Sequence, residues 1–119
     1  MGAKLTEVVV DAADPERLAG FWADVLGWHR TGAYEGVVEI GDSGGARPTL
    51  VFVPVPEPKS AKNRVHLDVN PTGCDQHEEL ARLLDLGAVE VDVGQGDQTW
   101  VVLADPEGNE FCLLRTRVD

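Results

Sequence analysis

One short segment, Arg64–Asn70 (RVHLDVN), carries most of the side chains suited to chemistry. Successive residues of a strand point to opposite faces, so a strand over this segment separates polar from apolar side chains. The polar face would hold Arg64, His66, Asp68 and Asn70, and the apolar face Val65, Leu67 and Val69. Such a polar row is typical of the wall of a wet cleft rather than of a core. Because an imidazole changes charge near neutral pH, His66 is our candidate general acid or base.

An internal repeat extends this interpretation to the first half of the chain. The dipeptide Leu-Gly recurs at positions 26–27 and 86–87, and Glu7 falls at the position that corresponds to His66. We therefore predict that Glu7 orients the imidazole or abstracts a carbon-bound proton itself. The alternative is a structural histidine, hydrogen-bonded to Asp68 or to a backbone carbonyl.

The elements that must position these residues follow the same order in both halves: a strand, a helix and three strands. Asp14 and Pro15 begin the first helix as N-cap and first helical residue, and Gly27 ends it. A capping-box-like start at Asp75 begins the second helix, and Gly87 ends it. The predicted strands are 5–11, 28–31, 34–40 and 48–55 in the first half, and 64–70, 88–93, 99–104 and 110–116 in the second.

Two βαβββ modules within one α+β domain of 119 residues are therefore predicted. Module 1 is expected at about residues 1–56 and module 2 at about residues 63–119, with a linker at about 57–62. A unit of this size does not bury its helix face alone, so the modules are expected to pair around one core. The alternative is an ordinary α+β sandwich in which the similarity between the halves is fortuitous.

Composition narrows the range of partners. The chain has 21 acidic and 10 basic residues, and its net charge at pH 7 is −11. This charge argues against nucleic acids and anionic membranes as partners, because both require a positive face. No apolar run approaches the ~20 residues that cross a bilayer. The two cysteines are too few for a disulfide scaffold, so we expect a cytoplasmic protein.

Several short motifs follow one another along nearly the whole chain: 14–19 (DPERLA), 25–28 (VLGW), 62–68 (KNRVHLD), 86–88 (LGA) and 105–112 (DPEGNEFC). In this order and spacing they resemble the vicinal oxygen chelate superfamily, which contains glyoxalase I, bleomycin resistance proteins and extradiol dioxygenases. More narrowly, they resemble its small glyoxalase-like proteins. The resemblance implies curved mixed sheets that enclose a cleft, with the helices outside, and a homodimer.

In metal-dependent members of that superfamily, the cleft holds a divalent ion on His, Gln or Glu side chains. Carried over by position, the resemblance puts these ligands at Glu7, His66 and Cys112, while the slot near residues 50–52 has no ligand. We therefore expect no cofactor. If a metal is bound, zinc is favoured, because it accepts carboxylate, imidazole and thiolate ligands together. The alternative role for Cys112 is a small buried apolar side chain.

Four side chains are candidates for contact with a small-molecule ligand. Arg64 and Asp68 belong to the polar row, and Phe52 and Trp100 are the aromatic residues best suited to a pocket wall. Core packing is the alternative for both aromatic residues. A run of bases would anchor a carboxylate or a phosphate, or would simply lie in a solvated loop: Arg47, Lys59, Lys62 and Arg64.

Two functions of different class fit these features. The first is a glyoxalase-like lyase or isomerase that acts on a small oxygenated metabolite, with Glu7 and His66 as its acid/base residues. The second is a non-catalytic protein that sequesters an antibiotic or another aromatic or cationic compound, as bleomycin resistance proteins do. The polar row favours the first function, whereas the incomplete ligand set and the net charge favour the second. Whether the protein is an enzyme stays open at this point.

Overall fold

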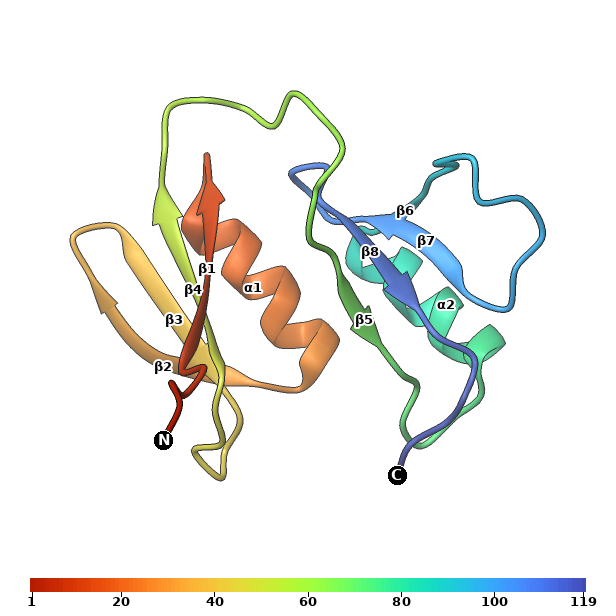
Figure 1. The fold of residues 1–119 in the computed structure, drawn as a ribbon, viewed down its shortest axis with the longest axis horizontal. Helices are drawn as coiled ribbons and strands as arrows, with labels where there is room; N and C mark the ends of the chain where they lie inside the picture. Colours follow the sequence, from red (N-terminus) through yellow and green to blue (C-terminus); the bar gives the residue numbers. More distant parts are fainter. The chain divides into compact units, whose positions relative to one another are not determined.

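The computed structural model describes all 119 residues and divides into two compact units. Met1–Pro58 is called module 1 and Lys59–Asp119 is called module 2, and the division falls inside the predicted linker. Each module has one helix and one four-stranded mixed sheet in the order β-α-β-β-β (Figure 1). The predicted α+β class and the two tandem modules are confirmed.

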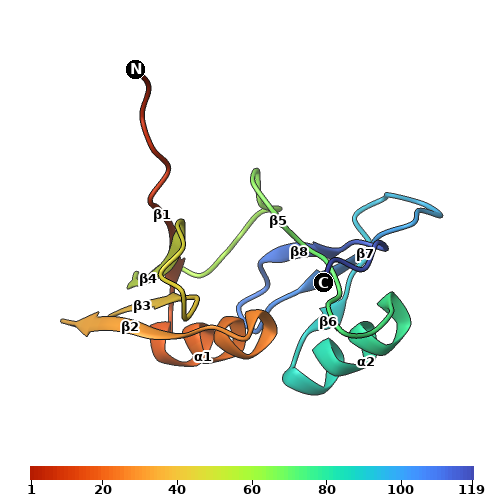
Figure 2. The same cartoon turned by 90° about the horizontal axis from the view of Figure 1, so that it is seen from below.

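Module 1 consists of β1 (Glu7–Ala12), α1 (Pro15–Leu26), β2 (His29–Tyr34), β3 (Val37–Gly41) and β4 (Thr49–Pro54). Its strands lie in the order β1-β4-β3-β2, in which β1 and β4 are parallel and the other pairs are antiparallel. Figure 2 shows α1 along one face of this sheet, where it contacts β3 and β4.

Local signals account for α1. The carboxylate of Asp14 accepts a hydrogen bond from the Arg17 N–H at 3.2 Å, and Gly27 ends the helix with a φ of 66°. A positive φ is easily adopted only by glycine, so this residue suits the C-terminal cap. The helix buries a stripe of apolar side chains against the sheet: Leu18, Phe21, Trp22 and Val25. The predicted start, end and buried face of this helix are confirmed.

Module 2 repeats the plan with β5 (Leu67–Val69), α2 (Gln76–Leu86), β6 (Val89–Glu90), β7 (Val101–Ala104) and β8 (Glu110–Leu113). Its sheet has the order β5-β8-β7-β6, with β5 parallel to β8. Asp75 caps α2 by accepting from the Glu78 N–H at 2.8 Å, and Gly87 ends the helix in the left-handed conformation. Neither α1 nor α2 has the length and apolar character required to cross a membrane.

All four strands of module 2 are shorter than the sequence pattern predicts, and β5 and β6 differ most. The segment expected at 64–70 forms a strand only at Leu67–Val69, and the one expected at 88–93 forms only Val89–Glu90. The pairing of β5 with β8 begins at Leu67 and Phe111, so residues 64–66 lie at the end of the ladder. Val65 is consequently 77% exposed, which corrects its expected position on a buried face.

A tight turn at Asp105–Asn109 joins β7 to β8 and so fixes the position of β8. The buried carboxylate of Asp105 accepts from the backbone N–H groups of Glu107 and Asn109, and from the Asn109 side-chain amide. Gly108 has a φ of 86°, as the predicted turn requires. Because β8 carries Glu110 and Cys112, this turn also helps to position these two side chains.

Candidate functional site

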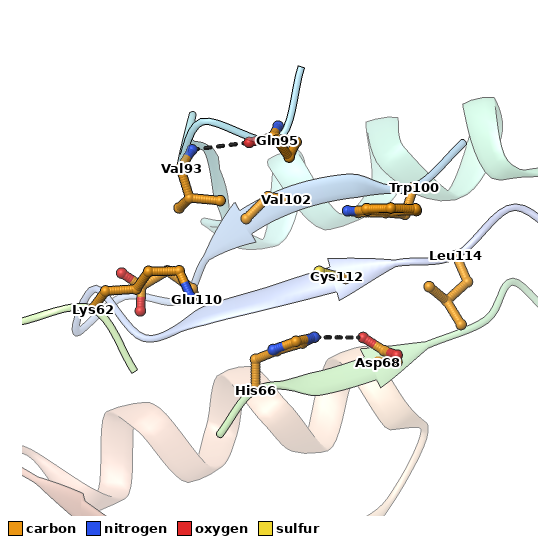
Figure 3. A pocket seen from close by; sticks show the side chains of 10 residues that line it. All are labelled: Lys62, His66, Asp68, Val93, Gln95, Trp100, Val102, Glu110, Cys112 and Leu114. Carbon is orange, nitrogen blue, oxygen red and sulfur yellow. Dashed lines mark hydrogen bonds and ion pairs between the residues drawn. The ribbon is translucent and has the colours of Figure 1, made fainter. Parts of the chain in front are cut away.

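The candidate site is a pocket of about 360 Å³ in module 2 (Figure 3). It lies on the sheet face that carries Val102 and Cys112, whereas the alternate residues of β7 and β8 are buried on the opposite face. The apolar part of its lining is Val93, Trp100, Val102, Cys112 and Leu114. The polar part is Lys62, His66, Asp68, Gln95 and Glu110. Polar side chains around an apolar floor are what small-molecule pockets commonly have.

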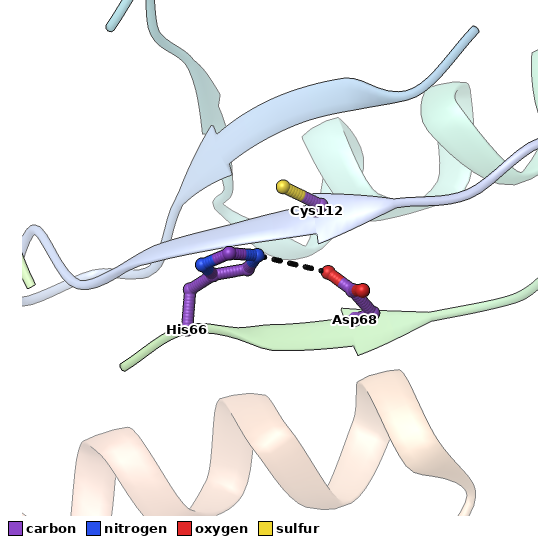
Figure 4. A group of neighbouring side chains, drawn as sticks. All are labelled: His66, Asp68 and Cys112. Carbon is purple, nitrogen blue, oxygen red and sulfur yellow. Dashed lines mark ion pairs between the residues drawn. The ribbon is translucent and has the colours of Figure 1, made fainter. Parts of the chain in front are cut away.

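Strand geometry explains why three side chains that could bind a metal or exchange a proton lie close together in this pocket. Asp68 lies two residues after His66, so the two side chains share one face of the β5 segment. The parallel register pairs Asp68 with Cys112 of β8, which places the thiol on the same face. The Nε2 atom of His66 lies 3.2 Å from Oδ1 of Asp68, and all three donor groups have atoms within 4.8 Å of one another (Figure 4).

The environment of Cys112 favours the thiol over the thiolate, because it raises the pKa of the sulfur. The side chain is buried, and this burial raises the pKa of the thiol above its ordinary value. The Asp68 carboxylate raises the pKa further by its charge and by a hydrogen bond, while Lys62 acts in the opposite direction. A protonated, buried thiol is a poor nucleophile, so the site does not favour covalent catalysis by Cys112.

The charged end of the pocket contains one tightly held carboxylate. Glu110 accepts hydrogen bonds from the Asn63 N–H at 2.9 Å and from Nζ of Lys59 at 3.0 Å. Burial tends to raise the pKa of Glu110, but these hydrogen bonds outweigh it and lower the pKa below the ordinary value. The side chain of Lys62 lies beside Glu110 in Figure 3. Lys59 is bonded to Glu110 but is not part of the lining, whereas Lys62 lines the pocket.

The aromatic end of the pocket is formed by Trp100. This residue immediately precedes β7, and it lies at the end of the sheet near Leu114, away from Glu110 (Figure 3). Trp100 is 37% exposed, which is a large apolar exposure for a tryptophan. Trp100 therefore lines this pocket, and its predicted contact with a ligand stays a prediction.

Module 1 has a smaller pocket, of about 120 Å³, on its own sheet. Glu7 and Glu39 supply its carboxylates, and the rest of the lining is Gly32, Tyr34, Val37 and Val51. Both oxygens of Glu39 accept from threonine hydroxyls, Thr31 at 2.8 Å and Thr49 at 3.0 Å. This volume holds only a few water-sized groups, so the pocket of module 2 is the better ligand site.

The structure brings four of the predicted site residues together in one pocket. His66, Asp68, Cys112 and Trp100 all line the pocket of module 2, whereas Glu7 lines the pocket of module 1. Arg64 is exposed but is not part of either lining. Phe52 is completely buried in the core of module 1 and lines neither pocket, which corrects its predicted place at a ligand wall.

Several lining residues were not predicted as ligand contacts. Glu110 and Leu114 alternate with Cys112 along β8, so the period of a strand was a usable signal for both. Val102 pairs directly with Cys112, a relation that only the register reveals. Val93 and Gln95 lie in the irregular segment after β6, where the sequence carries no comparable periodicity.

Comparison with protein families gives the site its context. A family model described as a glyoxalase-like domain matches residues 7–114, which is nearly the whole chain. The chain belongs to the glyoxalase-like domain family. This agrees with the resemblance to the glyoxalase, bleomycin resistance and dioxygenase superfamily drawn from the motifs. No curated protein matches the sequence at a significant level.

Solved structures share the fold of this glyoxalase-like chain at low sequence identity. The fosfomycin resistance protein of Mesorhizobium loti is 14% identical, with a TM-score of 0.73 over 96% of this chain and 92% of that one. A glyoxalase/bleomycin resistance protein/dioxygenase family enzyme from Burkholderia phytofirmans PsJN is 17% identical, with a TM-score of 0.68 and coverage of 93% and 97%. An antibiotic-binding protein from Streptomyces sp. CB03234 is 20% identical, with a TM-score of 0.63 and coverage of 98% and 97%.

Proposed function

We propose that this glyoxalase-like protein binds a small organic molecule in the pocket of module 2. The observation that carries the proposal is the pocket itself, whose volume of about 360 Å³ falls within the range of ~300–1,000 Å³ that is usual for small-molecule sites. Its apolar floor favours burial of an uncharged part of the ligand, and its polar side chains fix the orientation of that ligand.

The two ends of the pocket define the chemical class of the ligand. Trp100 offers a flat, partly exposed indole, which suits a planar or aromatic group. Lys62 and Glu110 at the other end suit a polar group on the same molecule. The fosfomycin resistance protein and the antibiotic-binding protein among the structural neighbours support an antibiotic or another bioactive compound as the ligand. Sequestration of such a compound is therefore our first candidate function.

A second candidate function, lyase or isomerase chemistry on a small oxygenated metabolite, is favoured by one observation. The ion pair between His66 and Asp68 lies in the pocket, at 3.2 Å, and a carboxylate partner orients an imidazole for proton transfer. In this case His66 exchanges a proton with the bound molecule, and Asp68 holds the ring. Glu7 lines the pocket of module 1, and its acid/base role is kept here as part of the proposal. We also propose that the protein is a homodimer and that it is located in the cytoplasm.

A compound screen with matched aromatic variants tests the first candidate function. We expect a planar antibiotic or related compound to raise the melting temperature of the wild-type protein and to quench its tryptophan fluorescence. Trp100→Ala should lose both effects. Tyr34→Ala is the matched control, because Tyr34 is an exposed aromatic residue of module 1 outside the pocket of module 2. Equal binding by the Trp100→Ala variant would contradict the proposal.

The fate of the bound compound separates the two functions. Mass spectrometry after incubation should recover the compound unchanged if the protein sequesters it. A product that forms with the wild type but not with His66→Gln would instead establish acid/base catalysis in the pocket. Sedimentation measurements on the same samples report whether the protein is a dimer.

A further inference from the structure

We propose that the ligand of the module 2 pocket is a planar compound with one anionic group, such as an aromatic carboxylate, and that Lys62 binds this group. The inference rests on the proposed function, to which it adds the sign of the charge at the polar end of the ligand. An imbalance among the charged side chains of the pocket carries it. The carboxylates of the lining have partners within the protein, whereas Lys62 has no carboxylate partner.

The two carboxylates of the pocket are already bonded within the protein. Glu110 accepts hydrogen bonds from Nζ of Lys59 at 3.0 Å and from a backbone N–H at 2.9 Å. Oδ1 of Asp68 lies 3.2 Å from Nε2 of His66. Asp68 also forms a hydrogen bond with the thiol of Cys112. Neither carboxylate therefore requires a cationic group from the bound compound as its partner.

Lys62 differs from both carboxylates. It is the only lysine or arginine of the lining, and no ion pair of the structure includes it. In Figure 3 it lies beside Glu110, but the cation bonded to that carboxylate is Lys59. Burial and the charge of Asp68 raise the pKa of the Cys112 thiol, whereas the charge of Lys62 opposes this rise. The positive field of Lys62 thus reaches the floor of the pocket.

The position of Lys62 suits a molecule with a flat apolar body and one charged end. Lys62 and Trp100 lie at opposite ends of the pocket, with Val102 and Cys112 on the floor between them (Figure 3). A ring stacked on Trp100 lets a substituent extend along this floor toward Lys62. The protein has a net charge of −11, which repels anions at long range, so a local cation is required to hold one.

The number of available charges favours a monoanion over a phosphate. One unpaired ammonium group balances one negative charge, as a carboxylate has. A phosphate monoester carries about two negative charges above neutral pH. The second of these would lie near the carboxylate of Glu110 without a cation of its own, which is unfavourable.

Four probes with the same ring system test the sign and the number of charges: 2-naphthoate, 2-naphthamide, 2-naphthylmethylammonium and 2-naphthyl phosphate. Binding at pH 8 is followed by the NMR shift of the Trp100 indole N–H, which is assigned with Trp100→Phe and reports weak complexes. We expect naphthoate to bind about threefold to fivefold more tightly than naphthamide, as an exposed ion pair allows. The ammonium and phosphate probes should bind more weakly than naphthoate. The preference for naphthoate over naphthamide should shrink in 1 M salt, which screens exposed charges.

Matched variants test whether Lys62 supplies the charge. Lys62→Gln should bind naphthoate and naphthamide about equally, whereas Lys62→Arg should keep the preference because it keeps the charge. Arg64→Gln is the control, because Arg64 is an exposed cation two residues away that does not line the pocket. This control should keep the wild-type preference. Affinity for the uncharged naphthamide should be the same in all three variants, which establishes that their pockets are intact.

Different results overturn the inference and the proposed function. Equal binding of naphthoate and naphthamide by the wild type would overturn the inference and leave the pocket as a ligand site. Tighter binding of the ammonium or phosphate probe, or a naphthoate preference that survives Lys62→Gln, would do the same. If none of the four probes shifts the Trp100 indole signal, the proposed function is overturned together with the inference.

Discussion

Modules 1 and 2 share one topology but differ in the side chains of the sheet face that lines each pocket, which we call the open face. With Glu7 aligned to His66, the strand registers align Val9 with Asp68 and Val51 with Cys112. Module 1 therefore has one donor where module 2 has three. The relation is reversed on the neighbouring strand, where Glu39 of β3 corresponds to Val102 of β7.

The buried faces of the two modules follow a different rule. Leu50 and Phe52 of β4 correspond to Phe111 and Leu113 of β8, and all four side chains are buried. Folding requires an apolar face against the helix but places little demand on the open face. Once a module is duplicated, its open face is free to acquire a site, which explains how one scaffold carries unlike functions.

The largest loss of stability should come from changes to the buried sheet faces, which both modules have. Phe52→Ala and Phe111→Ala should each lower the free energy of unfolding by ~3–5 kcal/mol, because each leaves a large cavity in its module. Urea unfolding measures both. A small loss for Phe52→Ala would mean that this side chain is not part of a well-packed core, and it would reopen its predicted role as a ligand wall.

An intermediate loss of stability is expected in the turn that follows β7, and a smaller one in the turn that follows β3. Asp105→Ala should cost about 2 kcal/mol, because it removes a buried carboxylate and leaves the N–H groups of Glu107 and Asn109 without this acceptor. Asp42 occupies the corresponding place in module 1 and accepts from the Ala46 N–H at 3.1 Å. It is less buried, so Asp42→Ala should cost about 1 kcal/mol or less by the same measurement. Equal losses would contradict this difference.

The smallest effect concerns Glu110, which replaces Thr49 of module 1 in the aligned register. The pKa of Glu110 is lower in the folded protein than its ordinary value of 4.5, so its stabilisation is present above that pH. The stabilisation is lost as the pH falls through the lowered pKa. Glu110→Gln should therefore cost about 1 kcal/mol at pH 7.

The pH profile provides the check on Glu110. The difference in unfolding free energy between the wild type and Glu110→Gln should shrink as the pH falls below about 4.5. Glu57→Gln, a change to an exposed carboxylate near the end of module 1, should leave the profile unchanged. A difference that stays constant down to low pH would show that hydrogen bonds of the neutral side chain, rather than its charge, stabilise the site.

Local sequence signals predicted the helices and turns well. The cap at Asp14, the glycines that end both helices and the turn at Asp105–Asn109 all act over a few residues, so a short stretch of sequence contains their cause. Of the predicted polar row, His66 and Asp68 line the pocket as strand alternation suggested, whereas Arg64 and Asn70 do not.

Features set by pairing between distant strands were less predictable. The length of β5 is limited by its ladder with β8, which covers three residue pairs, and no pattern within 64–70 records this. The group of His66, Asp68 and Cys112 depends on the β5–β8 register, so the sequence alone did not place Asp68 beside Cys112. The prediction for Phe52 assigned it to the wrong face of its strand. Its neighbour Val51 lines a pocket, whereas Phe52 points into the core.

The short ladder of β5 has a consequence for hydrogen exchange. Within module 2, β5 lies at the edge of the sheet and pairs with β8 over three residues only, so its amides should exchange faster than those of the central strand. The hydrogen bond between Asp68 of β5 and the Cys112 thiol of β8 joins this edge strand to its neighbour through side chains. This side-chain bond adds to the few main-chain bonds that hold β5 in the sheet.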